Sequence, residues 1–444
     1  MKNLVFAAVV FGACAAAQTQ PASIAIRGAK IVTVSGPVIA RGTVVLHNGL
    51  IEAVGENVQP PAGAEIIDGS GLTVYPGLID ALSTWGIPQP GGRGGRGATT
   101  TAPAEPRANG PEDRPRTTSW IKAADEIQPN DRRIESARNA GFTTAVVFPT
   151  QGIFGGQGSV VNLAGTKSED MVLVPSVGQY IAMNAGRGFG GGFPSSLMGV
   201  IAYIRQIYLD ADYYKQVKAA YDRNPRGMKR PEYDRALEGV IESKRILLPA
   251  QREVEMDRMA RFAAELRQPA ILYGMREGYR AGDLLKRANL PVLVSLRWPE
   301  KPRDADPDEV DTMRTLENRE KSPSTPEVLK QAGVQFAFYS DGLDAPRDLQ
   351  RAVKKAIDSG LSREDALRAL TLSPAEIYGI ADRLGSIEQG KIANLAVTRG
   401  EIFDDSTRVE MVFIDGVKYV PTPEPAGRGG AASGNRVEDR GEQR

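Results

Sequence analysis

The chain has 444 residues, of which 41% are hydrophobic and 25% charged, so it can bury a sizeable core. Its 55 Lys and Arg against 54 Asp and Glu leave a formal charge of +1, which argues against a nucleic-acid-binding surface. The chain contains one histidine, His47, and one cysteine, Cys14. Cys14 lies in the N-terminal apolar stretch, so a mature chain cleaved after it would hold no cysteine. Zinc sites built from several His or Cys, thiol catalysis, structural disulfides and c-type haem attachment are therefore excluded within one mature chain. A Ser–His–Asp triad would have to use His47.

Residues 1–17 have the layout of a secretory signal peptide. Met1 and Lys2 form a charged start, residues 4–13 are apolar, and three alanines complete a small-residue cleavage site. The apolar run is too short to cross a bilayer, and no later segment is long enough either, so we expect an exported protein without a transmembrane segment. Its expected location is the periplasm or the medium. The alternative is a lipoprotein, because residues 11–14 loosely resemble a lipoprotein box with Cys14 as the lipidated residue.

Both ends of the chain have the pattern of short β-strands. The predicted strands are residues 25–34, 43–47 and 50–54 near the start, and 392–398, 409–414 and 417–420 near the end. Asn48-Gly49 and Asp415-Gly416 separate two pairs of these strands, and such dipeptides favour type I′ hairpins. The two β-rich ends predict one small sheet domain assembled from both termini. His47, one residue before a turn, is then expected to be a surface hairpin residue.

The middle of the chain alternates short apolar runs with helical patterns. The apolar runs are typical of buried parallel strands and comprise residues 143–148, 171–174, 246–248, 270–273, 292–296 and 334–339. Residues 253–266 carry an apolar stripe at helical spacing. This alternation predicts an α/β fold, either a (β/α) barrel or a doubly wound sheet.

Several segments fall outside this alternation. Residues 89–116 are rich in Gly, Pro, Arg and Thr and predict a mobile insertion, which we favour over an RNA-binding Gly-Arg segment. Residues 421–444 form a polar tail. The Gly-rich stretches 154–159 and 186–192 lack the signatures of phosphate or dinucleotide loops, and we interpret both as tight loops at a barrel mouth.

Two motifs resemble the amidohydrolase superfamily, particularly its imidazolonepropionase-like and cyclic-imidase-like members. Residues 68–80, with the sequence DGSGLTVYPGLID, resemble the segment through which the family's chain passes from its first β strands into the barrel. Ser373-Pro374-Ala375 and residues 385–395, GSIEQGKIANL, resemble the segment where the chain leaves the barrel. The resemblance covers roughly residues 22–420.

The resemblance implies a (β/α)₈ TIM-type barrel with a composite β-sandwich domain formed by the N- and C-terminal segments. The implied boundaries are a signal peptide over 1–17, the two halves of the sandwich over 22–75 and 381–420, a barrel over 76–380 with a disordered insertion at 89–116, and a disordered tail over 421–444.

The family's chemistry requires one or two divalent metals at the barrel mouth, usually zinc, held by a His-x-His pair, two later His and an Asp. The positions that match the pair are Leu82 and Thr84, while Pro249 and Gly274 lie near the later ligands. Only Asp341 matches a family ligand, and no His occurs after position 47. We therefore expect no metal cofactor. A hard cation held by Asp341 and Glu277 is the alternative.

If the fold is correct, polar residues should surround the barrel mouth. The expected catalytic residue is Asp341, and the expected binding residues are Trp85, Gln157, Arg252, Arg276, Glu277 and Arg297. Asn162, Asn184 and Trp298 belong to the same neighbourhood. Three converging arginines would suit an anionic small molecule. A structural role for Asp341, bonded to loop amides or to an Arg, is the alternative.

The function these observations favour is that of an exported amidohydrolase-fold protein, by descent a hydrolase of C–N bonds in cyclic amides, imides or dipeptide-like compounds. With its metal ligands replaced, its metal-dependent catalysis is expected to be lost. The alternatives are a non-catalytic ligand- or partner-binding protein, and metal-free catalysis that uses Asp341 with arginines. The expected partner is a small molecule rather than nucleic acid, and a homo-oligomer is left open.

Overall fold

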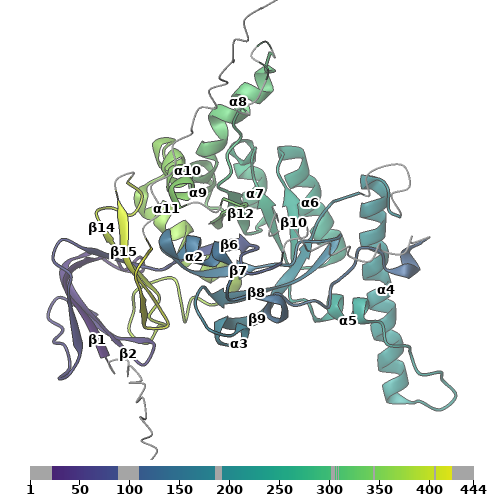
Figure 1. Cartoon of the computed structure of the whole chain (residues 1–444). Helices are drawn as coiled ribbons and strands as arrows, with labels where there is room; N and C mark the ends of the chain where they lie inside the picture. Colours follow the sequence, from purple (N-terminus) through teal and green to yellow (C-terminus); the bar gives the residue numbers. More distant parts are fainter. Residues whose placement is uncertain are drawn as a thin grey trace, which may run out of the picture.

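The computed structural model describes residues 23–88, 110–185, 193–301, 306, 308, 310–343, 346–404 and 407–422. The predicted signal peptide with Cys14, the Gly-rich stretch 186–192 and all but two residues of the predicted tail lie outside these ranges. So does the predicted insertion, except for its last seven residues, where Arg114 is ion-paired with Asp210 and Asp234. The described chain forms a curved sheet beside a barrel with helices around it (Figure 1).

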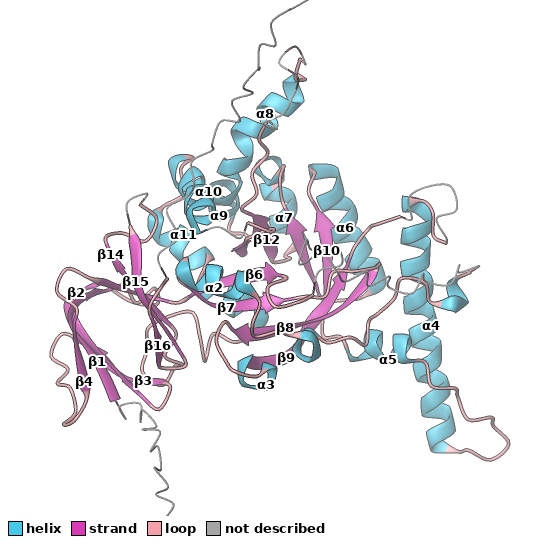
Figure 2. Ribbon diagram, viewed as in Figure 1, coloured by secondary structure: helices cyan, strands magenta, loops and turns pink. Residues whose placement is uncertain are grey.

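Strands from both ends of the chain form one eight-stranded sheet (Figure 2). Its members are β1 (Ser23–Ile31), β2 (Ile39–His47), β3 (Leu50–Gly55), β4 (Glu65–Asp68), β5 (Thr73–Pro76), β14 (Leu395–Arg399), β15 (Arg408–Ile414) and β16 (Val417–Tyr419). The order is β16-β15-β14-β5-β1-β2-β3, with β4 beside β1, so the antiparallel pair β5–β14 joins the two ends. Both predicted hairpin turns have positive φ at their two residues, as a type I′ turn requires. The packing of this sheet as a β-sandwich stays a prediction.

The second eight-stranded sheet is a nearly closed barrel. Its strands are β6 (Leu78–Ser83), β7 (Phe142–Val147), β8 (Phe154–Asn162), β9 (Val172–Ile181), β10 (Ile246–Ala250), β11 (Ala270–Gly274), β12 (Val292–Ser295) and β13 (Phe336–Tyr339). All neighbours pair in parallel except β8, which is antiparallel to both β7 and β9. The connection over 148–153 is too short for the crossover that a parallel strand requires, so the chain turns back as a hairpin.

The Gly-rich stretch 154–159 is therefore a strand, and its interpretation as a loop at the barrel mouth is wrong. All nine residues of β8 are buried. A Cβ at Gly158 would lie 2.2 Å from the ring of Phe148, and one at Gly155 would lie 2.5 Å from the Pro149 carbonyl oxygen. These glycines allow the hairpin to pack closely rather than to bend freely.

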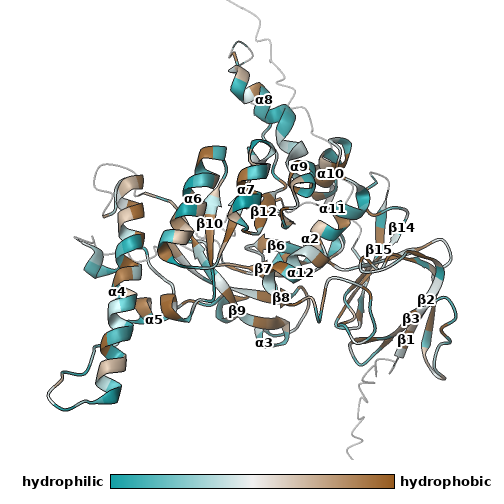
Figure 3. Ribbon diagram, turned by 180° about the vertical axis from the view of Figure 1, so that it is seen from behind, coloured by the Kyte–Doolittle hydropathy of each residue, from teal (hydrophilic) through white to brown (hydrophobic). Residues whose placement is uncertain are grey.

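Helices cover the outside of the barrel (Figure 1). They are α1 (Ala123–Glu126), α2 (Arg132–Asn139), α3 (Ser168–Met171), α4 (Leu197–Arg223), α5 (Arg235–Glu242), α6 (Glu253–Leu266), α7 (Gly282–Ala288), α8 (Met313–Lys321), α9 (Thr325–Ala332), α10 (Pro346–Asp358), α11 (Arg363–Ala369) and α12 (Leu372–Tyr378). In Figure 3, α8 is mostly hydrophilic, whereas β10 and β12 are hydrophobic. Within the described ranges, no helix combines the length and the apolar character needed to cross a bilayer.

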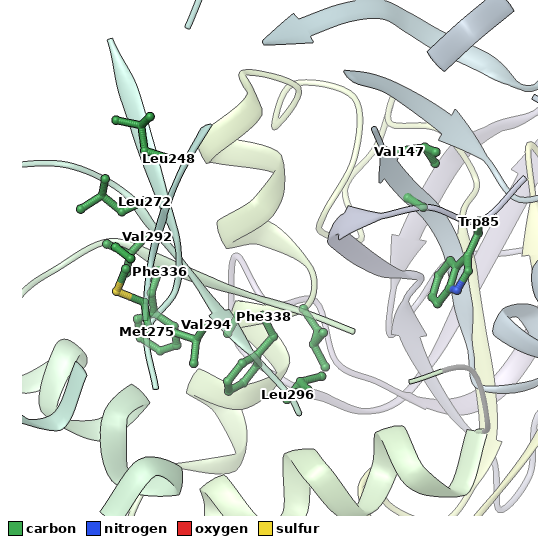
Figure 4. Close-up of a cluster of buried hydrophobic side chains, with 14 of the residues drawn as sticks. Trp85, Val147, Leu248, Leu272, Met275, Val292, Val294, Leu296, Phe336 and Phe338 are labelled. Atoms are coloured by element: carbon green, nitrogen blue, oxygen red, sulfur yellow. The ribbon is translucent and has the colours of Figure 1, made fainter. Parts of the chain in front are cut away.

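The alternation of side chains along the barrel strands divides the core into two clusters. Leu248, Leu272, Val294 and Phe338 belong to the cluster that the strands form with the surrounding helices (Figure 4). The residues one step out of phase, including Leu247, Ile271, Leu293 and Ala337, form a second cluster. Tyr273 and Tyr339 belong to this second cluster and stand at the C-terminal ends of their strands. Asp341 follows two residues after the end of β13.

Candidate functional site

A cavity of about 260 Å³ opens where the barrel strands end. It is lined by Leu82, Ser83, Thr84, Trp85, Thr150, Tyr180, Tyr273, Tyr339, Ser340, Asp341 and Gly342. These residues come from the C-terminal ends of β6, β9, β11 and β13 and from the loops that follow β6, β7 and β13. Catalytic and binding residues of parallel barrels lie at this end of the strands, so we take this cavity as the candidate site.

Two further cavities, of about 290 and 520 Å³, lie on the sheet built from both ends of the chain, which we call the composite sheet. His47 lines the smaller one, where its ring nitrogens are 2.9 Å from Ser23 Oγ and 3.0 Å from Asn48 Nδ2. Strand ends of the barrel do not reach either cavity. The only histidine of the chain is thus held in the hairpin region, away from the barrel mouth.

Asp341 lies immediately beyond the buried end of β13. Its φ of 50° is left-handed, a conformation that Asp tolerates better than most residues, and Gly342 follows with φ 76°. The Ser295 hydroxyl, at the end of β12, donates a 2.7 Å hydrogen bond to Asp341 Oδ2. Ser295 Oγ in turn accepts a 3.1 Å hydrogen bond from the Arg297 backbone N–H. The carboxylate is therefore fixed by the neighbouring strand and faces the cavity.

Three tyrosines form the walls beside Asp341. The rings of Tyr180 and Tyr273 stack with centroids 5.2 Å apart, and the Tyr273 hydroxyl donates to the Ile181 carbonyl oxygen at 3.1 Å. Burial raises the pKa of Tyr180, Tyr273 and Tyr339, and the negative charge of Asp341 contributes to the rise in each case. All three hydroxyls therefore stay protonated at neutral pH.

Asp80 lies beneath this cavity and is completely buried in β6. Its Oδ1 accepts hydrogen bonds from the backbone N–H groups of Ser340, at 3.0 Å, and Leu82, at 3.4 Å. Its Oδ2 has no partner among the described residues. Burial raises the pKa of Asp80 to about 7, against the lowering effect of its hydrogen bonds. The side chain joins β6 to the residue after β13, at the seam of the barrel.

Sequence reasoning did not place Asp80 in the site. The signal was a lone acid within the apolar run 78–82, because Asp is almost never fully buried without a specific partner or role. Tyr180, Tyr273, Tyr339 and Ser295 were missed as well. They lie near strand ends, where a site is expected, but nothing local distinguishes them from ordinary core residues.

The comparisons with known proteins agree with this geometry. Residues 298–418 match the model of the amidohydrolase family. The crystal structure of an amidohydrolase from Thermotoga maritima superposes with a TM-score of 0.72 and 28% identity, over 90% of this chain and all of that one. The chain thus resembles the amidohydrolases in sequence over residues 298–418 and in fold over nine-tenths of its length.

Two more distant proteins match as well. The amidohydrolase tasK of Hapsidospora irregularis is 22% identical over 86% of this chain, which spans only 40% of that protein's length. A prolidase structure complexed with N-methylphosphonate-L-proline is 16% identical and has a TM-score of 0.54, over 90% of this chain and all of the prolidase. At that identity the likeness concerns the fold alone.

The residues that the sequence predicts at the barrel mouth lie in different places in the structure. Trp85 lines the cavity, although its ring is buried edge-on against Phe142 with centroids 5.4 Å apart. Gln157 is buried in β8, donates to the Gly239 carbonyl oxygen at 2.9 Å and accepts from Ser176. Asn162 accepts a 2.8 Å hydrogen bond from Asn394, where the barrel meets the composite sheet. Gln157 and Asn162 are not among the residues that line the cavity.

The three arginines do not converge in the cavity lining. Arg252 is exposed and pairs with Glu255 on its own helix, at 2.7 Å. Arg297 donates to the Gly342 carbonyl oxygen at 2.9 Å, at the rim. Arg276 is half-buried near Tyr339, whose pKa its charge lowers in part.

Glu277 is buried and is held by neighbouring elements. It accepts hydrogen bonds from Arg314, the shortest at 2.8 Å, and from the Glu253 backbone N–H at 3.2 Å. The second tryptophan, Trp298, donates to the Ala352 carbonyl oxygen at 2.8 Å. Neither Glu277 nor Trp298 lines the cavity. Asn184 does not line it either, and its carbonyl oxygen accepts a hydrogen bond from the Arg116 guanidinium.

The barrel order supports the matching of residues to the superfamily's ligand positions. β10, β11 and β13 are the fifth, sixth and eighth strands of the sheet, and they carry Pro249, Gly274 and, just beyond β13, Asp341. At the first strand, the Leu82 side chain has no donor atom, and Thr84 Oγ1 accepts a 3.2 Å hydrogen bond from Arg133. The residues at these positions provide one carboxylate and no imidazole, so they do not fit the ligand set of the superfamily.

Proposed function

We propose that this chain is an exported member of the amidohydrolase superfamily that no longer uses the metal-dependent hydrolysis of its relatives. By descent it is a hydrolase of non-peptide C–N bonds, in cyclic amides, imides or dipeptide-like compounds. Its barrel mouth serves to bind a small molecule. The proposal includes the signal peptide over 1–17, with lipidation of Cys14 as the alternative, and a composite β-sandwich beside the barrel.

The observation that carries the proposal is the set of side chains at the mouth. A metal-bound hydroxide needs several ligands with lone pairs aimed at one point. Leu82, Pro249 and Gly274 supply none from their side chains, and Thr84 is a neutral hydroxyl. Asp341 alone is an ionisable ligand, and one of its oxygens already accepts from Ser295. The cavity itself is retained, which favours binding over complete loss of a site.

Elemental analysis of the untagged, mature protein tests the proposal. We expect Zn, Mn and Fe far below one equivalent, and no change in melting temperature when Zn²⁺ or Mn²⁺ is added. A hydrolase screen with cyclic amides, imides and dipeptides should give no metal-dependent turnover. One equivalent of tightly bound metal, or activity that a chelator removes, would contradict the proposal and would require ligands from another chain or from unexpected residues.

A second candidate is metal-free hydrolysis with Asp341 as the base. The fixed Ser295–Asp341 hydrogen bond favours it, because an oriented carboxylate could accept a proton from a bound water. Ser295 itself is 2% exposed and does not line the cavity, so it is a positioning residue in this scheme rather than a nucleophile. Turnover that persists in chelator and is lost in Asp341→Asn would favour this candidate.

A further inference from the structure

The sign of the charge in the barrel-mouth cavity indicates what it binds. Among its described lining residues, Asp341 is the only one with a carboxyl group, and Lys, Arg and His are absent. The influence of Asp341 extends across the cavity, because its charge contributes to the raised pKa of all three tyrosines. This inference rests on the proposed function, since a resident metal would use the same carboxylate.

The arginines near the cavity do not reverse this sign at its surface. Arg133 donates from Nη1 to Thr84, while its Nε and Nη2 are paired with Asp131, at 2.6 Å for the shortest contact. Arg297 is turned to the backbone carbonyl of Gly342. Arg276 influences Tyr339 but is not a lining residue. An anion in the cavity would therefore be repelled by Asp341. A cation would be attracted by Asp341 and would meet no arginine among the described lining residues.

The remaining walls are aromatic and hydroxylated. Tyr180, Tyr273, Tyr339 and Trp85 are the aromatic lining residues, of which Tyr180 is the least buried, and Ser83, Thr84, Thr150 and Ser340 are the hydroxylated ones. Aromatic rings around a carboxylate attract weakly hydrated organic cations through their electron-rich faces. A volume of about 260 Å³ suits a compact molecule.

We propose that the barrel-mouth cavity binds a compact organic ammonium ion, with Asp341 as its counter-ion and the tyrosine rings as its walls. The cationic nitrogen lies near Asp341, whose Oδ2 is held by Ser295 and whose orientation is thereby fixed before binding. No bond is made or broken in this step. The expectation of an anionic ligand depended on three arginines that converge, and the cavity lining contains none of the three.

Calorimetric titration of the full mature protein tests this inference with choline and tetramethylammonium as probes. The matched neutral probe is 3,3-dimethylbutan-1-ol, which replaces the choline nitrogen by carbon, and the anionic probes are acetate and phosphate. We expect both cations to bind, and the neutral isostere to bind at least about tenfold more weakly. Absence of choline binding, or tighter binding of acetate or phosphate, would overturn the inference. Displacement of choline by Mg²⁺ or Ca²⁺ would assign the site to a hard cation instead.

A matched pair of variants locates the binding. Asp341 and Asp415 both have left-handed φ, 50° and 53°, and each precedes a glycine. Asp341→Asn should weaken choline binding at least about tenfold, whereas Asp415→Asn, in the composite sheet, should leave it unchanged. Tyr180→Phe keeps the ring and should keep affinity, and Tyr180→Leu should lower it. Equal affinity in Asp341→Asn and Asp415→Asn would overturn the assignment.

The same preparation separates this inference from the proposed function. Metal-free protein that fails to bind choline overturns the ammonium site and leaves the proposed function standing. Stoichiometric metal in the elemental analysis overturns the proposed function, whatever the titration shows. Metal-free protein that binds choline through Asp341 supports both.

Discussion

The two ends of the barrel differ in how completely their polar groups are satisfied. At the end that meets the composite sheet, Asn394 donates to Thr144 and Asn162, at 3.0 and 2.8 Å, and accepts from the Asp415 backbone N–H at 2.8 Å. At the mouth, Asp80 Oδ2 is buried without a partner. The other described buried side-chain atoms that lack a partner belong to Gln179 and Tyr208, in β9 and α4, and none lies at the junction.

This difference indicates that one end of the barrel serves stability and the other serves binding. Hydrogen bonds at the junction fix how two sheets meet, and leaving such a bond unmade is expensive in a buried environment. The mouth retains a cavity and an unsatisfied carboxylate, which cost stability and are typical of sites that interact with something else. Substitutions at the junction should therefore change stability, and substitutions at the mouth should change pH dependence or binding.

The largest expected effect concerns Asp80. Its folded-state pKa of about 7 lies above the unfolded value of 3.8, so the folded protein binds a proton that the unfolded chain has released between these pH values. The stabilising contribution is complete below about pH 4 and is lost as the pH rises through 7, by up to about 4 kcal/mol of unfolding free energy. Urea denaturation of the wild type and Asp80→Asn between pH 4 and 8 measures it.

The amide of Asp80→Asn can still accept the hydrogen bond from Ser340, so the fold should persist. Other titrating groups contribute equally to both proteins, and only the difference between the two pH profiles is attributed to Asp80. We expect a flatter profile for the variant. Parallel profiles would show that the buried carboxyl does not titrate in this range.

The fold could be predicted further than the site. The segments 68–80 and 385–395 predict the two passages between sheet and barrel, and the six apolar runs of the middle region fall on β7, β9, β10, β11, β12 and β13. β8 was missed because Gly155, Gly156 and Gly158 have no side chains to show the alternation of a strand. Glycine is needed there because a side chain would collide with Phe148 or Pro149 across the hairpin, and the sequence pattern of β8 does not show these contacts.

The site was predicted only at Asp341 and Trp85, which do line the cavity. Arginines are recognisable in a sequence, but the direction of a long flexible side chain depends on its neighbours. Arg252 turns to Glu255, three residues away, and Arg297 turns to a backbone carbonyl. Tyrosines at strand ends look like core residues until the strands are placed side by side. Which polar group pairs with which is therefore a property of the assembled barrel.

The junction provides the next largest effect. Asn394→Ala removes the acceptor for the Asp415 N–H and the donors to Thr144 and Asn162. Leaving buried polar groups unpaired should lower the unfolding free energy by about 3 kcal/mol. Equilibrium urea denaturation checks the value, and choline titration below the unfolding transition should give the wild-type affinity. A variant as stable as the wild type would contradict the proposed importance of this junction.

A smaller loss is expected from Gly77→Ala at the same junction. An added Cβ would lie 2.1 Å from Thr143 Oγ1 and 2.3 Å from its Cγ2, too close without movement of β7. Overpacking of this kind should cost about 2 kcal/mol in unfolding free energy, measured by urea denaturation. Gly36→Ala is the matched control, because its Cβ would have its nearest neighbour, Thr33 Oγ1, at 3.6 Å. Similar stabilities for the two variants would mean that β7 adjusts freely.

Asp341→Asn should have the smallest effect on stability and the clearest effect on binding. Asp341 is partly exposed, and an amide oxygen can still accept the hydrogen bond from Ser295, so the unfolding free energy should change by less than about 1 kcal/mol. Removal of the only carboxylate among the described lining residues should nevertheless reduce the preference for choline over its neutral isostere at least about tenfold. Thermal unfolding and calorimetric titration of one preparation give both values. Asn394→Ala should show the opposite pattern, with a large loss of stability and unchanged affinity. If both variants lost stability and affinity together, the two ends of the barrel would be coupled and the division between them would fail.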